Sequence, residues 1–287
     1  MTNELVTIQT GIQGQASTDS QLIALWLHGK SEHSQAAYGS DVRRFLDFTC
    51  KPLQAVTLGD LQAFNDSLDG AQNTKRRIIS SIKSLYTFGQ KLGYLQFNVA
   101  AALRAPKAKD ELAARILSEE EVMSMIAKTD KQRDKVLLRL LYASAGRVSE
   151  ICALTWKDVQ PNGDSGQVTL FGKGGKTRAV RLSKATYQAL CALDTGASDD
   201  APVFVSQKGG ALDESQVWRL VRAAAVRAGI GGKVSPHWFR HSHASHALDR
   251  GASVVLVRDT LGHSSLAVTS RYTHAKPNES SALHLAI

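Results

Sequence analysis

The chain has 287 residues, of which 43% are hydrophobic and 21% charged, and it carries a formal net charge of +9. Because single cores usually run to about 100–200 residues, this length predicts two domains. The basic surplus favours a polyanionic partner, and a basic protein that is merely soluble is the alternative. No apolar run approaches the ~18–20 residues of a membrane span, so we expect no membrane association.

The cysteines and the first residues bear on the compartment. Cys50, Cys152 and Cys191 are scattered and form no C-x-x-C pair, which favours a reducing compartment over a disulfide scaffold. Residues 1–19 are polar and lack the regions of a signal peptide, so we expect a flexible leader. Together these features predict a cytoplasmic protein.

Residues 20–104 show helical periodicity. Tyr38, Val42 and Phe45 recur at the spacing of one buried helix face. Thr57 can cap a third helix, and a fourth is expected from about Asn73 to Leu92. We therefore predict a helical first domain over these residues. Basic side chains on its helices are candidates for contacting a DNA backbone, with a solvated helix face as the alternative: Arg43, Arg44, Lys75, Arg76, Arg77 and Lys83.

Residues 105–115 are short, polar and interrupted by proline, as in a linker. Ser118 and Glu121 then form the capping box of a new helix, so a second domain is expected over residues 116–287. Its strands are predicted at 168–171 and 177–182 around a glycine-rich tip, with a short third strand at 203–205. Further helices are predicted at 136–144, 147–154, 215–228, 237–250, 253–261 and 280–286.

The fold class predicted is mainly α with a small antiparallel β-sheet, an α+β protein. The second domain adds four basic residues to the candidate DNA contacts: Lys176, Arg178, Arg219 and Arg222.

Arg147 and Arg240 stand on two predicted helices, each beside a short break. A phosphodiester repels nucleophiles, and guanidinium groups aimed at its oxygens lower that barrier. Arginine stays charged and binds two oxygens at once. No acidic D-x-D cluster lies near these residues, so we expect no metal clamp and no cofactor.

Tyr272 is the candidate nucleophile. A phenol titrates near 10 in water, so attack at neutral pH needs nearby positive charge and a proton acceptor. A half-buried aromatic is the alternative, and the position of Tyr272 nine residues after His263 in Leu261-Gly262-His263 argues against it.

His237 and Arg240 are three residues apart and share a helix face, with Pro236 as a first-turn residue. His237 and His241 also have i, i+4 spacing, which raises metal binding as an alternative. No H-E-x-x-H occurs, and no cysteine or carboxylate nearby in sequence completes a zinc site. We therefore predict no metal, and a packing or hydrogen-bonding role for His241 and His246.

Lys173 lies at the tip of the predicted hairpin, from which it can reach a DNA groove and protonate a leaving 5′ oxygen. The glycines around it do not form a P-loop, because the G-x-x-x-x-G-K-[ST] pattern is absent. Glu150, one helical turn after Arg147, can orient His237 or Arg147.

Five motifs resemble those of the tyrosine recombinases, or phage integrase family, and look most similar to the Xer-like members: Gly146-Arg147-Val148-Ser149-Glu150, Gly172-Lys173-Gly174, His237-x-x-Arg240, Leu261-Gly262-His263 and Tyr272. The resemblance implies a SAM-like core-binding domain followed by a catalytic domain. A mild departure is Trp238-Phe239, which is bulkier than the pair often found there.

The resemblance also implies roles for residues. Arg147, Arg240 and His263 would bind the scissile phosphate, and Lys173 would be the general acid. His237 would be a general base or a phosphate ligand. Tyr272 would attack, leaving a 3′-phosphotyrosine and a free 5′-hydroxyl, without metal or ATP.

As partners, the resemblance implies double-stranded DNA with a specific recombination site and a homotetramer on two duplexes that passes through a Holliday junction. The free protein would be a monomer or dimer, and a partner recombinase is compatible with the sequence. We expect the apolar end of the chain, residues 280–287, to dock on a neighbour and control Tyr272. The outcome would be integration, excision or dimer resolution in the nucleoid. Two alternatives are a type IB topoisomerase-like relaxing enzyme and a DNA-binding protein without catalysis.

Overall fold

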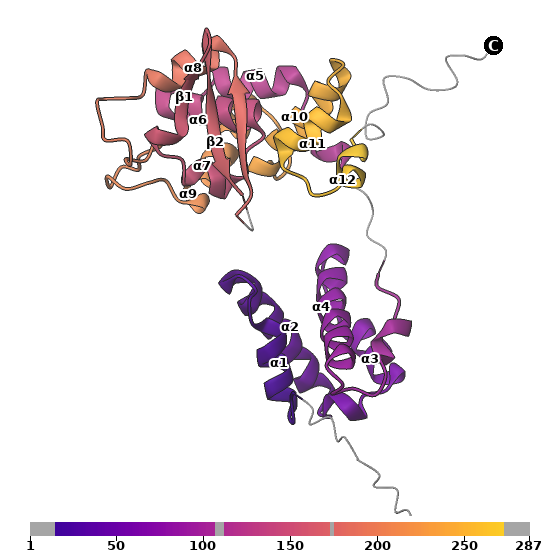
Figure 1. Cartoon of the computed structure of the whole chain (residues 1–287). Helices are drawn as coiled ribbons and strands as arrows, with labels where there is room; N and C mark the ends of the chain where they lie inside the picture. The colour runs from indigo at the N-terminus through magenta and orange to yellow at the C-terminus, as the bar shows by residue number, and fades with distance from the viewer. Residues whose placement is uncertain (1–14, 107–111, 173–174, 273–287) are drawn as a thin grey trace, which may run out of the picture. The chain divides into compact units, whose positions relative to one another are not determined.

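The computed structural model describes residues 15–106, 112–172 and 175–272. It forms two compact units, Met1–Lys109 and Asp110–Ile287, which are coloured from indigo to yellow along the chain in Figure 1. The division falls within the stretch that the sequence indicates as a linker.

The N-terminal unit is helical throughout its described part. Its α-helices are α1 (Asp19–Leu27), α2 (Glu32–Thr49), α3 (Leu58–Ser67) and α4 (Gln72–Lys91), with 3-10 turns η1 (Leu53–Ala55) and η2 (Val99–Ala102). Phe45 is fully buried, and its ring lies edge-on to Phe64 and Tyr86, at centroid distances of 5.0 and 6.3 Å. The predicted cap of α3 is confirmed, because Thr57 and Asp60 form a complete capping box.

Two of the basic residues predicted to contact DNA have partners inside this unit. Arg77 on α4 forms a two-pronged ion pair with the buried Asp41 on α2, with Nη2 2.8 Å from Oδ1. Lys83 donates to the carbonyl oxygens of Ala101 and Leu103, at 3.2 and 2.5 Å. Both side chains therefore bind elements of the unit to one another.

The remaining candidates on these helices are open to solvent to differing degrees. Lys75 is half-buried, and three arginines are exposed: Arg43, Arg44 and Arg76.

The C-terminal unit contains one antiparallel sheet among its described residues, ordered β1 (Val159–Asn162), β2 (Ser165–Phe171) and β3 (Thr177–Leu182). Val168 pairs with Val180 on β3 and with Val159 on β1. The predicted hairpin is thus confirmed, while its tip at 173–174 lies outside the described residues. The expected third strand was wrong: β1 takes that role, and Val205 forms only an isolated bridge with Ala211.

Helices pack around this sheet (Figure 1). They are α5 (Glu119–Ala127), α6 (Gln132–Ser144), α7 (Val148–Cys152), α8 (Lys184–Cys191), α9 (Glu214–Ala228), α10 (Pro236–Asp249), α11 (Val254–Leu261) and α12 (Leu266–Ser270), with 3-10 turns η3 (Ala113–Arg115) and η4 (Trp156–Asp158). Ser118 and Glu121 cap α5 as predicted. The helix predicted at 280–286 lies outside the described residues.

The unit has a large core and a small one. In the large core, Val168 and Leu170 of β2 pack with Leu137 of α6 and Phe239 of α10, all fully buried. The small cluster joins the segment before α5 to α10, α11 and Tyr272. The predicted class, mainly α with a small antiparallel sheet, is confirmed. No helix in the described ranges is long and apolar enough to cross a bilayer.

We predict that Arg77→Ala lowers the free energy of unfolding of the N-terminal unit by about 1–3 kcal/mol, because it leaves the Asp41 carboxylate buried with fewer donors. Arg76→Ala, an exposed change at the neighbouring position, should be nearly neutral. Denaturant unfolding followed by circular dichroism measures both. Equal stability of the two variants would contradict a structural role for Arg77.

Candidate active site

The turn between α6 and α7 positions Arg147. Helix α6 ends at Ala145, which has a left-handed backbone with φ 49°, and Gly146 follows. A Cβ on Gly146 would lie 2.7 Å from Cδ1 of Ile151 and 3.1 Å from Oγ of Ser144, so the lack of a side chain lets these residues pack against the turn. Arg147 then becomes the N-cap of α7, where its amide donates to Glu150 Oε2 at 2.8 Å.

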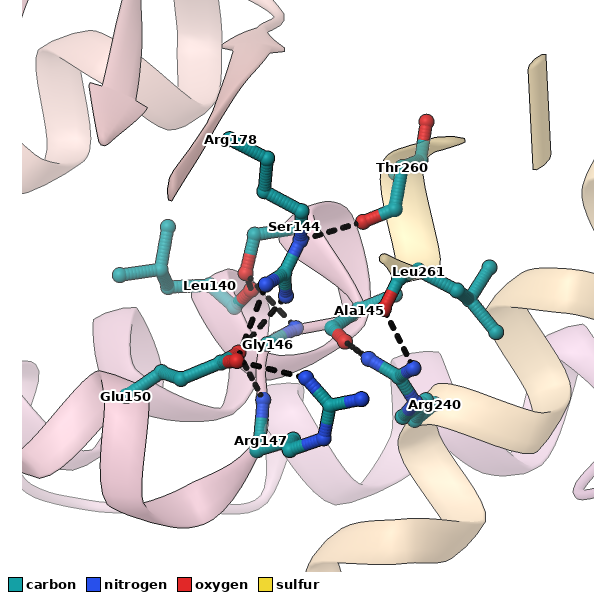
Figure 2. Close-up of polar contacts among 10 residues, drawn as sticks. All are labelled: Leu140, Ser144, Ala145, Gly146, Arg147, Glu150, Arg178, Arg240, Thr260 and Leu261. Atoms are coloured by element: carbon teal, nitrogen blue, oxygen red, sulfur yellow. Dashed lines mark hydrogen bonds and ion pairs between the residues drawn. The ribbon is translucent and has the colours of Figure 1, made fainter. Parts of the chain in front are cut away.

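Glu150 joins two arginines. Its carboxylate accepts from Nη1 of Arg147 at 2.8 Å and from Nη1 and Nη2 of Arg178 at 2.9 and 2.7 Å (Figure 2). Burial by itself would raise the pKa of Glu150, but the bonds from Arg178 and Arg147 outweigh it and hold the pKa at about 2. The carboxylate is therefore ionised at neutral pH.

Arg178 ties β3 to α11, because its Nε donates to the carbonyl oxygen of Thr260 at 2.7 Å. The sequence placed Arg178 among the DNA contacts. Its side chain is only 11% exposed, and its guanidinium is engaged by Glu150 and Thr260. The sequence predicted that Glu150 orients either His237 or Arg147, and the structure shows the contact with Arg147. The contact of Glu150 with Arg178 was not predicted.

Arg240 on α10 is buried and held by two helix ends. Its Nη1 donates to the carbonyl oxygen of Ala145 at 2.6 Å, and its Nη2 donates to that of Leu261 at 2.5 Å (Figure 2). Carbonyls at helix C-termini carry partial negative charge and favour a cation. Burial and the nearby Arg147 and Arg178 lower the pKa of Arg240 to about 10, so it stays charged near neutrality.

His263 completes a hollow of about 390 Å³ that also borders Arg147 and Arg178. It follows Gly262, which ends α11 with φ 63°, and its Nδ1 lies 2.9 Å from Oγ1 of Thr269. Burial, together with the charges of Arg240 and Arg147, lowers the pKa of His263 to about 4. A neutral histidine beside fixed guanidinium groups suits a bound anion such as a phosphodiester. Lys176, a candidate DNA contact, is exposed at the rim of the hollow.

His237 lies in the first turn of α10, one turn before Arg240 and His241, and follows the predicted N-terminal Pro236. It is exposed, yet the protein packed behind its ring and the charges of Arg240 and Arg147 lower its pKa. The imidazole is therefore neutral near pH 7 and free to accept a proton or a hydrogen bond.

Tyr272 is buried just after α12, and its hydroxyl lies 2.8 Å from Nδ1 of His241. Burial raises the pKa of the phenol, and Arg240 and Arg271 offset part of that effect. Burial and the charged groups around it lower the pKa of His241 to about 4. The sequence predicted that His241 and His246 form packing or hydrogen bonds, and both do, since His246 bonds the hydroxyl of Tyr142. Nothing in the sequence indicated Tyr272 as the partner of His241.

The structure thus brings four of the predicted residues together. Arg147 follows the end of α6, Arg240 lies on α10, His263 follows α11 and Tyr272 follows α12. His237 lies on α10 with Arg240. Lys173 lies outside the described residues. Arg219 and Arg222 are exposed on α9. Among the described residues, no group of three or more His, Cys, Asp or Glu side chains is arranged to hold a metal ion.

The fold and the site define a helix-rich protein of two units with an anion cradle beside a tyrosine hydroxyl. Residues 115–279 match the phage integrase family, and residues 21–91 match the phage integrase N-terminal SAM-like domain. The chain belongs to the phage integrase family.

Curated relatives include tyrosine recombinases named XerC. That of Xanthomonas campestris pv. campestris (strain B100) is 41% identical over 204 residues, which cover 69% of this chain and 63% of the relative. That of Xylella fastidiosa (strain M23) is 34% identical over 261 residues, covering 86% of this chain and 87% of the relative. The match therefore spans under two thirds of the Xanthomonas relative and most of the Xylella one.

Solved structures share the fold. A lambda integrase dimer bound to a COC′ core site has a TM-score of 0.72 at 17% identity, covering 92% of this chain and 79% of that one. XerH bound to palindromic difH in a post-cleavage complex has a TM-score of 0.72 at 22% identity, covering 91% and 82%. At these identities the likeness concerns the fold alone.

We predict that Glu150→Gln lowers the free energy of unfolding of the C-terminal unit by on the order of 3 kcal/mol, because Arg147 and Arg178 lose their buried counter-charge. The control is Asp164→Asn, which removes an exposed ion pair with Arg181 at 3.6 Å and should cost at most about 1 kcal/mol. Thermal or denaturant unfolding measures both. A loss no larger for Glu150→Gln than for the control would contradict the account.

A second prediction concerns acid. The pKa values of His241 and His263 are near 6.5 in the unfolded chain and about 4 in the folded protein. Their unfolded forms therefore bind protons first, and stability is lost as the pH falls from about 6.5 towards 4. Melting temperatures measured across this window should decline less steeply in His241→Asn and His263→Gln than in the wild type. An unchanged slope in both variants would refute this.

Proposed function

We propose that the chain is a site-specific recombinase that cuts and rejoins DNA through an ester between Tyr272 and a DNA 3′-phosphate. The observation that carries the proposal is the cradle of Arg147, Arg240 and His263 at the helix ends that border Tyr272. The family membership and the recombinase names of the relatives support it.

In the proposed reaction, the Tyr272 Oη attacks the phosphorus and forms a new P–O bond while the bond to the 5′ oxygen breaks. The guanidinium groups of Arg147 and Arg240 stabilise the negative charge that grows on the non-bridging oxygens. The leaving 5′ oxygen takes a proton from Lys173, and the phenol proton passes to a neutral base, for which His237 is the candidate if it is not a phosphate ligand. A 5′-hydroxyl from another strand reverses these steps, so the ester conserves the bond energy and ATP is not needed.

The described arrangement represents Tyr272 before attack. Its phenol is buried, its pKa is raised, and its hydroxyl bonds to His241. The phenol is therefore protonated at neutral pH, and attack has to be coupled to proton removal. His241, which is neutral, holds the hydroxyl group until that step.

We extend the proposal to the partners. The substrate is double-stranded DNA with a specific recombination site, and the working assembly is a homotetramer on two duplexes formed from monomers or dimers. A lambda integrase of similar fold, at 16% identity, was solved as a tetramer bound to a Holliday junction. The proposed backbone contacts are the half-buried Lys75 and six exposed basic residues: Arg43, Arg44, Arg76, Lys176, Arg219 and Arg222.

Covalent trapping tests the proposal. Nicked suicide duplexes drawn from DNA flanking the gene are incubated with wild type and with Tyr272→Phe and run on a denaturing gel. We expect a shifted band with wild type that Tyr272→Phe lacks, because the phenylalanine ring has no oxygen to form the ester. Tyr38→Phe, which removes a phenol from the N-terminal unit, is the control and should form the adduct normally.

Other outcomes would contradict this assignment. An adduct that persists in Tyr272→Phe would mean that another residue is the nucleophile. Tight binding without an adduct on any duplex would favour a DNA-binding protein without catalysis. Relaxation of plasmids that lack a dedicated site would favour a topoisomerase-like activity.

A further inference from the structure

A second hollow, of about 620 Å³, lies beside His237. Its lining shares no residue with the hollow beside His263. The residues that line it are Arg115, Trp218, Lys233, Ser235, His237, Trp238 and His241. The phosphate cradle leaves this space without a role.

Trp218 gives the hollow an aromatic wall that the core does not require. Its side chain on α9 is 38% exposed, whereas the neighbouring Val217 and Val221 are fully buried. Helix α9 therefore buries its apolar face without this indole. A large aromatic group left partly in water next to polar groups is typical of a binding surface.

The charge of the lining favours a nucleic-acid ligand. Lys233 is exposed at the hollow, Arg115 borders it, and no carboxylate is among the described lining residues. Aromatic rings interleaved with cations are the composition of sites for unpaired nucleotides, because bases stack on the rings and phosphates pair with the cations.

The approach to the hollow is open. Residues Gly231 and Gly232 precede Lys233; a Cβ on Gly231 would meet nothing within 4 Å, and one on Gly232 would lie 3.9 Å from the Trp238 ring. Neither glycine therefore places a side chain against the Trp238 ring.

We propose that this hollow binds an unstacked nucleobase of the exchanging strand, next to the scissile phosphate, by stacking on Trp218. This inference rests on the proposed function. His237 lines the hollow and lies one helical turn from Arg240 in the cradle, so a strand held by its phosphate at the cradle presents a neighbouring nucleotide to the hollow. Strand exchange requires bases beside the break to leave the duplex, and stacking on the indole offsets that cost.

The test combines a protein change with a DNA change. The probe is the suicide duplex on which wild type forms the Tyr272 adduct, with an intact base or an abasic residue immediately 5′ or 3′ of the scissile phosphate. We expect Trp218→Ala to slow adduct formation about 5- to 100-fold on intact DNA, the range of one lost base–aromatic stack. Wild type should lose a similar factor on one of the two abasic duplexes. Trp218→Ala on that abasic duplex should form the adduct no more slowly than Trp218→Ala on intact DNA or wild type on the abasic duplex.

Controls separate stacking from folding. Trp218→Phe should retain most of the rate, because it keeps an aromatic face. Val226→Ala, at a position on the same helix that is 76% exposed, should leave the rate unchanged. If Trp218→Ala lowers the melting temperature, the comparison of wild-type rates on intact and abasic duplexes still tests the stacking site, because it uses no variant.

Three results would overturn the inference. These are a wild-type rate for Trp218→Ala, equal wild-type rates on intact and abasic duplexes, or losses that multiply when the two changes are combined. Each leaves the Tyr272 adduct of the wild type in place and so refutes the stacking site alone. Absence of any wild-type adduct would instead refute the proposed function and this inference with it.

Discussion

The buried carboxylate of Glu150 is the interaction on which the site depends. It lies between Arg147 and Arg178, with bonds of 2.7 to 2.9 Å to each guanidinium. Without that negative charge, the two arginines and the nearby Arg240 would repel one another in a partly dry environment. Burying such a cluster of charges costs desolvation energy, and its contribution here is to position the elements. It holds α7, β3 and α11 together, with Arg147 lining the hollow.

Arg240 depends on a second kind of anchor. Its guanidinium is bound by the carbonyl oxygens of Ala145 and Leu261, where α6 and α11 end. The left-handed conformation of Ala145, rare for a residue with a side chain, presents one of those oxygens. Burial, together with these fixed cations, lowers the pKa values of His237 and His263. One set of contacts thus gathers positive charge beside the hollow and keeps the two histidines neutral near pH 7.

The sequence predicts well what is local. The capping boxes at Thr57 and Ser118 and the proline that opens α10 each depend on residues within one helical turn. The hairpin follows from alternation, which is also local. Residue type and spacing singled out Arg147, Arg240, His263 and Tyr272, and the family resemblance then implied their roles. Their side chains lie where α6, α10, α11 and α12 meet.

Interactions between distant residues were not predictable. Arg178 and Glu150 are 28 positions apart, Tyr272 and His241 31, and Arg77 and Asp41 36. An arginine on a polar strand or helix face looks the same whether it binds DNA or a buried carboxylate, because only tertiary packing decides which partner it meets. Strand β1 was missed for a related reason: its sequence, VQPN, contains proline and has no alternation, and it pairs only because β2 lies beside it.

The central claim is that the guanidinium groups act by neutralising the charge of the scissile phosphate. The most direct measurement compares adduct formation by wild type and Arg147→Ala on a phosphodiester suicide duplex and on one with an uncharged methylphosphonate at the scissile position. The account predicts that Arg147→Ala is slower by about 10²–10³-fold on the phosphodiester and recovers most of that loss on the methylphosphonate, where one negative charge has been removed. An equal loss on both duplexes would contradict it.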